Sequence, residues 1–349
     1  MKPVWKRIAN GIFAALIFVL TIWSVFRGED LSQVLSHLQL ALPQYILAGI
    51  LCVIFYILAD AVTVCFLLRV LGLRVSPGRC ALYSFVGFFY CCITPSASGG
   101  QPMQIYYMHK DGIPAAMSTV VLAIITVVYK LVLVLTGAVI LLLRPDALMV
   151  HLQPVLPLVY LGMMLNIICI LALLFPIFWP GLVRKLAEKC FRLFHRFRPA
   201  KKQEARRLRL ERILNQYHDT AAFFHTHKVT IVTAFLIALV QRFALFLITW
   251  FTYRAFSLSG CSMPVIVGLQ SMIAAAADVL PLPGGMGVSE NMFLDIYPAI
   301  FGEELVLPGM MISRGISYYT QLLLSALMTA VAHILLILPQ KTPKERSSK

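Results

Sequence analysis

The segment Leu280–Glu290, "LPLPGGMGVSE", interrupts an apolar run that would otherwise continue as a membrane helix. It places two prolines, a glycine pair and a carboxylate directly after the apolar residues Met263–Leu280. Proline lacks a backbone donor and glycine is a poor helix former, so the helix is expected to end there. A second segment, Thr94–Pro102 or "TPSASGGQP", follows the apolar run Ala81–Thr94 in the same way. The fold therefore has to accommodate two broken helices.

The composition indicates an integral membrane protein. Of the 349 residues, 60% are hydrophobic and 13% are charged, and the mean hydropathy is +0.83. Long apolar runs cross a bilayer as α-helices, whereas barrel strands need short alternating segments. The expected spans are Gly11–Phe26, Gln44–Leu68, Ala115–Leu143, Val155–Phe178, Val229–Phe256 and Pro308–Leu338. We therefore expect an all-α polytopic membrane protein with about six full spans and two re-entrant broken-helix elements, formed from the two shorter runs.

The basic residues predict the orientation of the chain. The net charge is +15, and thirteen of the thirty Lys and Arg residues lie between Arg184 and Lys228. Basic residues gather on the cytoplasmic side of membranes and bind anionic headgroups. Residues 181–228 are thus expected to form a basic cytoplasmic loop with an amphipathic helix at the lipid surface. No nucleic-acid partner is expected. With both termini cytoplasmic, 24 basic residues lie inside, three lie in the membrane, and Arg27, Arg144 and Arg254 lie outside.

The two breaks belong to a pattern that occurs twice in a single membrane domain, residues 1–349. Residues 41–143 and 229–339 each contain a long span, a short apolar run, a glycine pair near proline, a short polar helix and another long span. The pairs Gly99–Gly100 and Gly284–Gly285 lie 185 residues apart. Three crossings separate them, so the second element enters from the opposite face, as in the inverted repeats of transporters. Two independent Gly-Pro kinks are the alternative.

Each break is predicted to form an anion site. A helix that begins inside the membrane presents unpaired N–H groups and the positive end of its dipole. Glycine lets a bound oxygen approach the backbone, so a phosphate or carboxylate is the expected occupant. Glu290 lies in the first turn after the second break, where it caps the helix, contacts a headgroup, or does both. The predicted headgroup-binding residues at the breaks are Gly99, Gly100, Gln101, Gln104, Gly284, Gly285, Gly287 and Glu290.

Charged residues inside the apolar runs are the remaining candidates. Arg314, on the span after the second break, is the leading candidate for a headgroup ligand, since a guanidinium matches phosphate geometry. Lys130 holds the matching place in the first half and is also predicted to bind a headgroup. Asp60, Arg242 and Asp278 are predicted to form intramembrane charge pairs. An ionisable group within a bilayer costs about 2.5–3.5 kcal/mol or more, so such groups face a cavity or each other.

Metal and cofactor chemistry are not expected. The eight cysteines include no Cys-x-x-Cys motif, histidine is not paired at ligand spacing, and most cysteines lie in apolar runs. Neither a metal site, a disulfide nor a cofactor is predicted. No catalytic residue is identified either, because the chain has no nucleophile elbow and no phosphate-binding P-loop.

These motifs resemble the lysylphosphatidylglycerol synthase transmembrane family, the flippase-like membrane module of multiple peptide resistance factor proteins. The resemblance covers about Ala9–Leu338 and rests on "TPSASGGQP", "YYMHKDGIP", "PLPGGMGVSE" and "SRG". Many relatives carry charged residues where this chain has Gln101, Gln104 and Tyr129. The resemblance implies a bacterial cell membrane protein that moves an aminoacylated lipid to the outer leaflet. Large members add a soluble aminoacyl-transferase domain, which is not expected after Pro339.

The resulting hypothesis is a translocase for an anionic or aminoacylated phospholipid such as lysylphosphatidylglycerol. A lipid-modifying transferase, named phosphatidylglycerol lysyltransferase in the family, and a small-anion transporter are the alternatives, together with a partner subunit that transports nothing. A lipid needs a lateral opening between helices, whereas a small anion needs a cavity sealed from lipid. The sequence leaves open the headgroup, the coupling ion, the direction of transport and a homo-oligomeric state.

Overall fold

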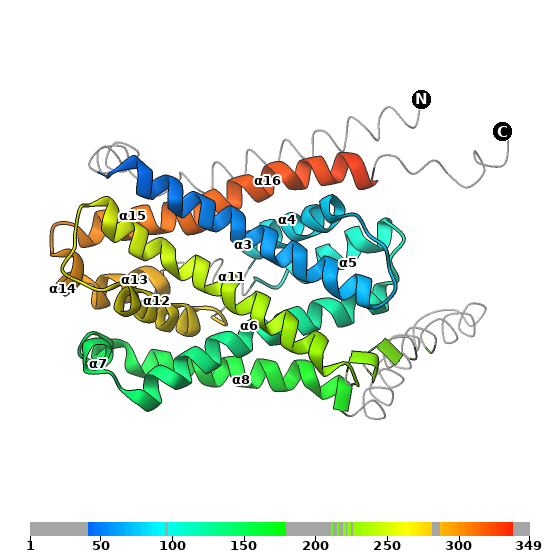
Figure 1. Cartoon of the computed structure of the whole chain (residues 1–349), viewed down its shortest axis with the longest axis horizontal. Coiled ribbons are helices and arrows are strands. Elements are labelled where there is room, and N and C mark those ends of the chain that lie inside the picture. Colours follow the sequence, from blue (N-terminus) through cyan, green and yellow to red (C-terminus); the bar gives the residue numbers. More distant parts are fainter. Residues whose placement is uncertain are drawn as a thin grey trace, which may run out of the picture.

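The computed structural model describes residues 41–94, 97–178, 226–280 and 287–337, with scattered positions between 211 and 224. Three predicted features lie outside these residues: the first span Gly11–Phe26, most of the basic loop 181–228, and the glycine pair Gly284–Gly285. In the described ranges all regular secondary structure is helical, and the helices form one bundle (Figure 1).

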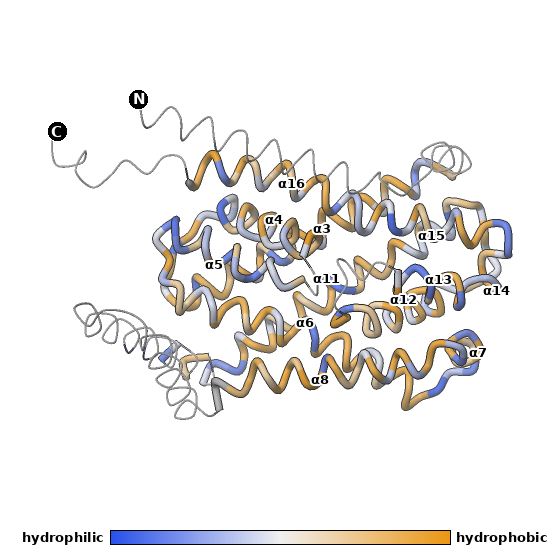
Figure 2. Tube along the Cα trace, turned by 180° about the vertical axis from the view of Figure 1, so that it is seen from behind, coloured by the Kyte–Doolittle hydropathy of each residue, from blue (hydrophilic) through white to orange (hydrophobic). Residues whose placement is uncertain are grey.

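Five of the described helical segments are long and apolar enough to cross a membrane. They are α3 (Pro43–Val70), α6 (Ala115–Leu143), α7 (Asp146–Leu152) continued by a 3₁₀ turn (Gln153–Val155) and α8 (Leu156–Phe178), α11 (Lys228–Ala255), and the last span, Val306–Leu336. Hydrophobic residues cover these segments and hydrophilic residues gather near their ends (Figure 2). The chain is therefore an all-α, multi-pass membrane protein, as the sequence predicted.

The first broken-helix element is a hairpin of α4 (Pro77–Ile93) and α5 (Gly100–Lys110), called the first hairpin below. Glycine is essential where the two helices touch. A Cβ on Gly100 would lie 2.2 Å from Sγ of Cys91 and 2.8 Å from the backbone oxygen of Gly87. The small residues therefore allow α5 to fold back closely along α4, at a separation that a side chain would prevent.

The second hairpin consists of α12 (Met263–Ala277) and α13 (Val288–Ile296). Gly287 precedes α13 with a φ of +81°, a conformation that other residues rarely adopt. A short helix, α14 (Pro298–Phe301), then leads into the last span, which contains α15 (Val306–Arg314), a π-helical segment (Gly315–Thr320), α16 (Gln321–Ala332) and a second π-helical segment (His333–Ile337). Both halves thus have the order long helix, short helix, break, short helix, long helix.

The two hairpins open toward opposite ends of the bundle (Figure 1). The first hairpin opens at the end where α3 finishes, and the second opens at the end where α11 finishes. The halves also exchange contacts: α4 packs against α16, α12 packs against α6 and α8, and the long helices α3 and α11 pack along each other. This is the geometry of an inverted repeat, and it brings the broken ends of both hairpins to the interior of the bundle.

Candidate functional site

A buried ion pair joins the second hairpin to the first half of the chain. Lys130 lies in the middle of α6, and Asp278 is the C-cap of α12, immediately before the second break. Lys130 Nζ is 2.6 Å from Asp278 Oδ2, and the two side chains are only 6% and 16% exposed. The same ammonium donates to Asn166 Oδ1 at 3.1 Å. The inner end of α12 is therefore held by charge inside the membrane, where water competes little.

Asn166 also organises the helix end around this pair. Its Nδ2 donates to the backbone oxygens of Gly162 at 2.9 Å and Ala275 at 3.0 Å. Gly162 brings α8 against α12 backbone to backbone, because a Cβ there would lie 2.4 Å from the Cα of Ala276. The last carbonyls of a helix have no N–H donor within the helix. Asn166 supplies such a donor to the carbonyl of Ala275, in the last turn of α12.

Asp60 and Arg242 were predicted as charge-pair residues, and the structure places both in the same interior region. The Asp60 carboxylate accepts a 2.6 Å hydrogen bond from Ser84 Oγ, which ties α3 to α4. The Arg242 guanidinium lies over the rings of Tyr129 at 4.2 Å and Tyr56 at 5.6 Å. Neither residue forms a salt bridge with a described partner, so only Asp278 of the three is in a direct ion pair, with Lys130.

The first break is closed by side chains of its own half. Thr94 Oγ1 accepts a 2.9 Å hydrogen bond from the backbone N–H of Gly99. Gln101, on the first turn of α5, donates through Nε2 to Thr126 Oγ1 on α6. Gln104 is buried, 7% exposed, against Gly87 of α4. Gln101 and Gln104 lie beside the break, as predicted. In this conformation, however, their side chains contact other parts of the protein.

At the second break, as at the first, a residue on the first turn of the short helix contacts the span that follows, but here both partners are charged. Glu290, on the first turn of α13, accepts from the backbone N–H of Gly287 at 2.8 Å through Oε2. Its other oxygen, Oε1, lies 3.2 Å from Nε of Arg314 on the last span. Glu290 therefore caps α13 and pairs with Arg314 simultaneously. The sequence placed both residues at a headgroup site, and the structure brings them together as partners.

The spans that follow the two breaks make their contacts at corresponding positions. The first residues of α5 and α13 are Gly100 and Val288, a shift of 188 residues. The same shift matches Thr126 with Arg314, one helical turn before Lys130. It also matches Lys130 with Tyr318, whose hydroxyl donates at 2.9 Å to the backbone oxygen of Cys92 at the inner end of α4. In each half, the span after the break therefore holds the re-entrant helix of the other half.

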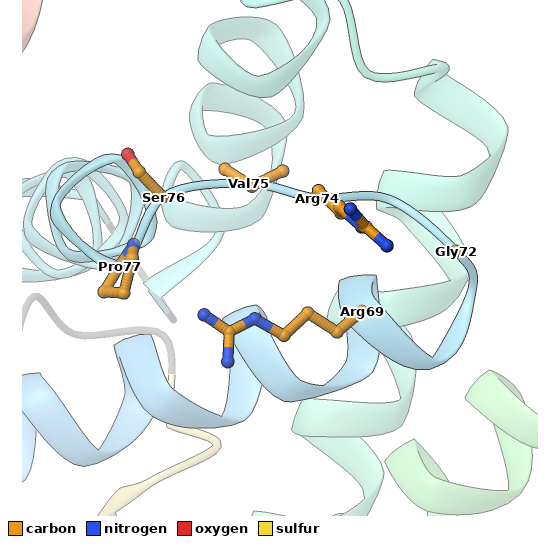
Figure 3. A pocket seen from close by; sticks show the side chains of 6 residues that line it. All are labelled: Arg69, Gly72, Arg74, Val75, Ser76 and Pro77. Atoms are coloured by element: carbon orange, nitrogen blue, oxygen red, sulfur yellow. The ribbon is translucent and has the colours of Figure 1, made fainter.

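A basic cavity lies beside the C-terminal end of α3 (Figure 3). It has a volume of about 690 Å³ and is lined by Arg69 at the end of α3 and by the turn Gly72 to Pro77, which includes Arg74. Neither arginine has a salt-bridge partner among the described residues. By contrast, Arg79 is 2.6 Å from Asp111 at the end of α5. The cavity can take an anionic group at the membrane surface.

The comparison with known families identifies this architecture. The family model for the lysylphosphatidylglycerol synthase TM region matches residues 11–325. The chain belongs to this family. The resemblance inferred from the motifs is therefore confirmed, and the lysylphosphatidylglycerol synthase TM family assignment fits a membrane module that acts on lipids. A search of the curated proteins finds no significant match.

Several residues around the Lys130–Asp278 pair, Arg242 and the first break were not among the candidates predicted from the sequence. The sequence alone does not single out Asn166 and Thr126, because single polar residues in an apolar run also occur without a function. Tyr56 was not considered, and Tyr129 was noted only as a departure from the family, although each ring contacts Arg242. A usable signal existed for Asn166, because an amide inside hydrocarbon has to find partners within the protein.

Proposed function

We propose that this protein translocates a phospholipid between the two leaflets of the membrane. The observation that carries the proposal is the meeting of two hairpins, one from each end of the bundle, at a common charged interior. A headgroup crossing a bilayer needs polar contacts at the midplane, and helix ends inside the membrane supply them next to a lipid-exposed surface. Acyl chains would remain in the surrounding hydrocarbon.

The interior charges suit a headgroup that carries both signs. Arg242 offers a cation, and the carboxylates of Asp278 and Glu290 would exchange their present partners, Lys130 and Arg314, for the ammonium groups of a headgroup. Phosphatidylglycerol presents one phosphate, and its lysyl ester adds ammonium groups. We infer that an aminoacylated phosphatidylglycerol such as lysylphosphatidylglycerol fits this set best, because each of its charges meets an opposite one.

The proposed setting is the cytoplasmic membrane of a bacterium with both termini in the cytoplasm. Arg69, Arg74, Arg79 and Lys110 all belong to the end at which the first hairpin opens. This distribution supports placing that end on the cytoplasmic side. The cavity beside Arg69 and Arg74 would then receive an anionic headgroup from the inner leaflet.

Translocation can be measured with purified protein in vesicles that contain a trace of tail-labelled fluorescent phosphatidylglycerol. A membrane-impermeant reductant destroys the label in the outer leaflet, so further loss of fluorescence reports lipid that has crossed. We expect protein-dependent loss for phosphatidylglycerol, and faster loss for its lysyl ester. If the protein leaves the inner-leaflet label protected in both cases, the proposal is refuted.

The first hairpin provides a matched pair of variants for this assay. In Gly100→Ala the new methyl group meets Cys91 Sγ and the Gly87 oxygen, whereas a Cβ on Gly78 in the same hairpin meets nothing within 4 Å. Overpacking costs about 1–3 kcal/mol, which corresponds to a rate decrease of about 5- to 150-fold if the hairpin contact is remade during transport. Gly78→Ala should retain the rate of the unmodified protein.

A further inference from the structure

Among the described residues, the buried guanidinium of Arg242 has no partner of opposite charge in direct contact. Arg242 lies at the centre of the 28-residue helix α11 and is 9% exposed. An arginine at this depth is costly unless an anion or a polar cavity accompanies it. Its position is also remote from both membrane surfaces, so the side chain cannot reach headgroups there in the way that a terminal arginine does.

The donors of Arg242 are unused within the described part of the chain. Nε is buried and has no hydrogen-bond partner, and no salt bridge joins the group to a described carboxylate. The guanidinium instead contacts the rings of Tyr129 and Tyr56. Cation–π contacts stabilise the charge, but they leave the five N–H donors available for hydrogen bonds.

Two carboxylates lie near enough to influence the guanidinium, and each is already engaged. Asp278 is paired with Lys130 at 2.6 Å, and Asp60 accepts from Ser84 at 2.6 Å. Their charges act on Arg242 and offset part of the cost of burying it. Neither carboxylate accepts a hydrogen bond from Arg242, so the N–H groups along the edge of the guanidinium remain available to another acceptor. An oxyanion with two oxygens in a plane is the natural complement of that edge.

We propose that Arg242 binds the phosphate oxygens of the transported headgroup at the membrane midplane, between Tyr56 and Tyr129. This assignment deepens the proposed translocation and rests on it. It replaces Arg314 as the leading phosphate ligand, because the structure pairs Arg314 with Glu290. The recognised chemistry is a phosphate oxyanion, whether it belongs to a lipid or to a free anion.

A polar face of the last span leads from one end of the bundle toward this site. Gln321, Ser325, Thr329 and His333 follow one another at four-residue spacing. The first contacts Cys92 Sγ of α4 at 3.7 Å, and the last contacts the Tyr107 hydroxyl of α5 at 3.2 Å. The face is therefore turned toward the first hairpin, whose inner end adjoins the interior charges.

Three atoms on this face are buried and have no hydrogen-bond partner among the residues that the structure describes: Ser325 Oγ, Thr329 Oγ1 and His333 Nε2. Unpartnered polar atoms are costly in a purely structural interface. After the 188-residue shift, Gln321, Ser325 and Thr329 match Leu133, Gly137 and Leu141 on α6, which are apolar. The last span is therefore polar at positions where its counterpart α6 is apolar. This difference supports a route along the last span by which a headgroup reaches Arg242.

The site can be tested by native mass spectrometry of the full-length protein with dioleoyl phosphatidylglycerol, compared with dioleoylglycerol, which lacks the phosphate. Arg242→Gln removes the charge. Arg254→Gln is the matched control, because Arg254 lies at the end of the same helix, donates to the Leu258 oxygen and lies over the Tyr45 ring. We expect Arg242→Gln to weaken phosphatidylglycerol binding about tenfold or more, the usual scale for a lost charge-assisted contact. Diacylglycerol binding should not change.

A conservative variant guards against misfolding of Arg242→Gln. Arg242→Lys retains the charge but presents a point donor in place of a planar fork, so phosphatidylglycerol binding should still weaken several-fold. Inorganic phosphate, added as a competitor, distinguishes the two sources of the anion. Displacement of the lipid by phosphate in the unmodified protein indicates a site for small anions as well, and no displacement indicates that the acyl chains are required. Unchanged phosphatidylglycerol binding in both Arg242 variants would overturn the assignment.

The vesicle assay separates this inference from the proposed function. Binding that depends on Arg242, in a protein that moves no fluorescent lipid, would keep the phosphate site and reject translocation. Translocation at the original rate by Arg242→Gln would keep the function and reject the site.

Discussion

The Lys130–Asp278 pair makes the sharpest stability prediction. Asp278→Asn preserves the shape of the side chain but leaves the Lys130 ammonium, 6% exposed, without its counter-charge. Breaking a buried ion pair by removing one partner costs about 3–5 kcal/mol. The Asn166 oxygen at 3.1 Å still accepts from Nζ, so we expect the lower end, about 3 kcal/mol. This corresponds to a change of roughly 150-fold in the unfolding equilibrium.

The measurement is equilibrium unfolding in mixed micelles, followed by circular dichroism as the denaturing detergent increases. Lys130→Met combined with Asp278→Asn removes both charges and should be less destabilised than Asp278→Asn alone, because no isolated charge remains. Arg79→Gln is the exposed control: Arg79 is 54% exposed in its pair with Asp111, so its loss should cost less than about 1 kcal/mol. Equal costs for Asp278→Asn and Arg79→Gln, or additive effects in the double variant, would refute the reasoning.

Three further outcomes are expected. Gly162→Ala should destabilise the protein by about 1–3 kcal/mol in the same unfolding assay, because the new methyl group meets the α12 backbone; Gly78→Ala, in open space, should not. Replacing Arg69 and Arg74 together by Gln should lower the affinity of the detergent-solubilised protein for anionic lipid by roughly tenfold or more, since each surface arginine contributes about 1 kcal/mol, and titration with anionic lipid in mixed micelles measures this. Tyr318→Phe should cost about 1 kcal/mol of stability, because only one neutral hydrogen bond, to the Cys92 oxygen, is lost.

The spans could be predicted because hydrocarbon imposes a simple length rule on apolar runs. The predicted run Gln44–Leu68 corresponds to α3, and Val229–Phe256 differs from α11 by one residue at each end. The first re-entrant helix begins at Pro77, four residues before the predicted start, because proline is favourable in the first helical turn and the apolar pattern alone does not reveal it.

The partners of the charged residues could not be predicted, because pairing depends on which helices touch. The sequence gives three acids and three bases in apolar runs, and this balance alone allows several pairings. Lys130 meets Asp278 only because α12 packs against α6, a contact between residues 148 positions apart. The isolation of Arg242 likewise follows from packing, since its neighbours Tyr56 and Tyr129 come from two other helices.

The corresponding contacts of the two halves differ in chemistry, and this difference bears on the resting state. In an alternating-access cycle, an inverted repeat changes state when the two halves exchange conformations. Here one half contributes the Lys130–Asp278 ion pair and the other contributes a hydroxyl-to-carbonyl bond between Tyr318 and Cys92. In such a cycle, the change from one state to the other would disturb the Lys130–Asp278 ion pair, and the reverse change would disturb the neutral Tyr318–Cys92 hydrogen bond. In the proposed translocation cycle we therefore expect the two states to differ in free energy, and every 1.4 kcal/mol of difference shifts their ratio about tenfold.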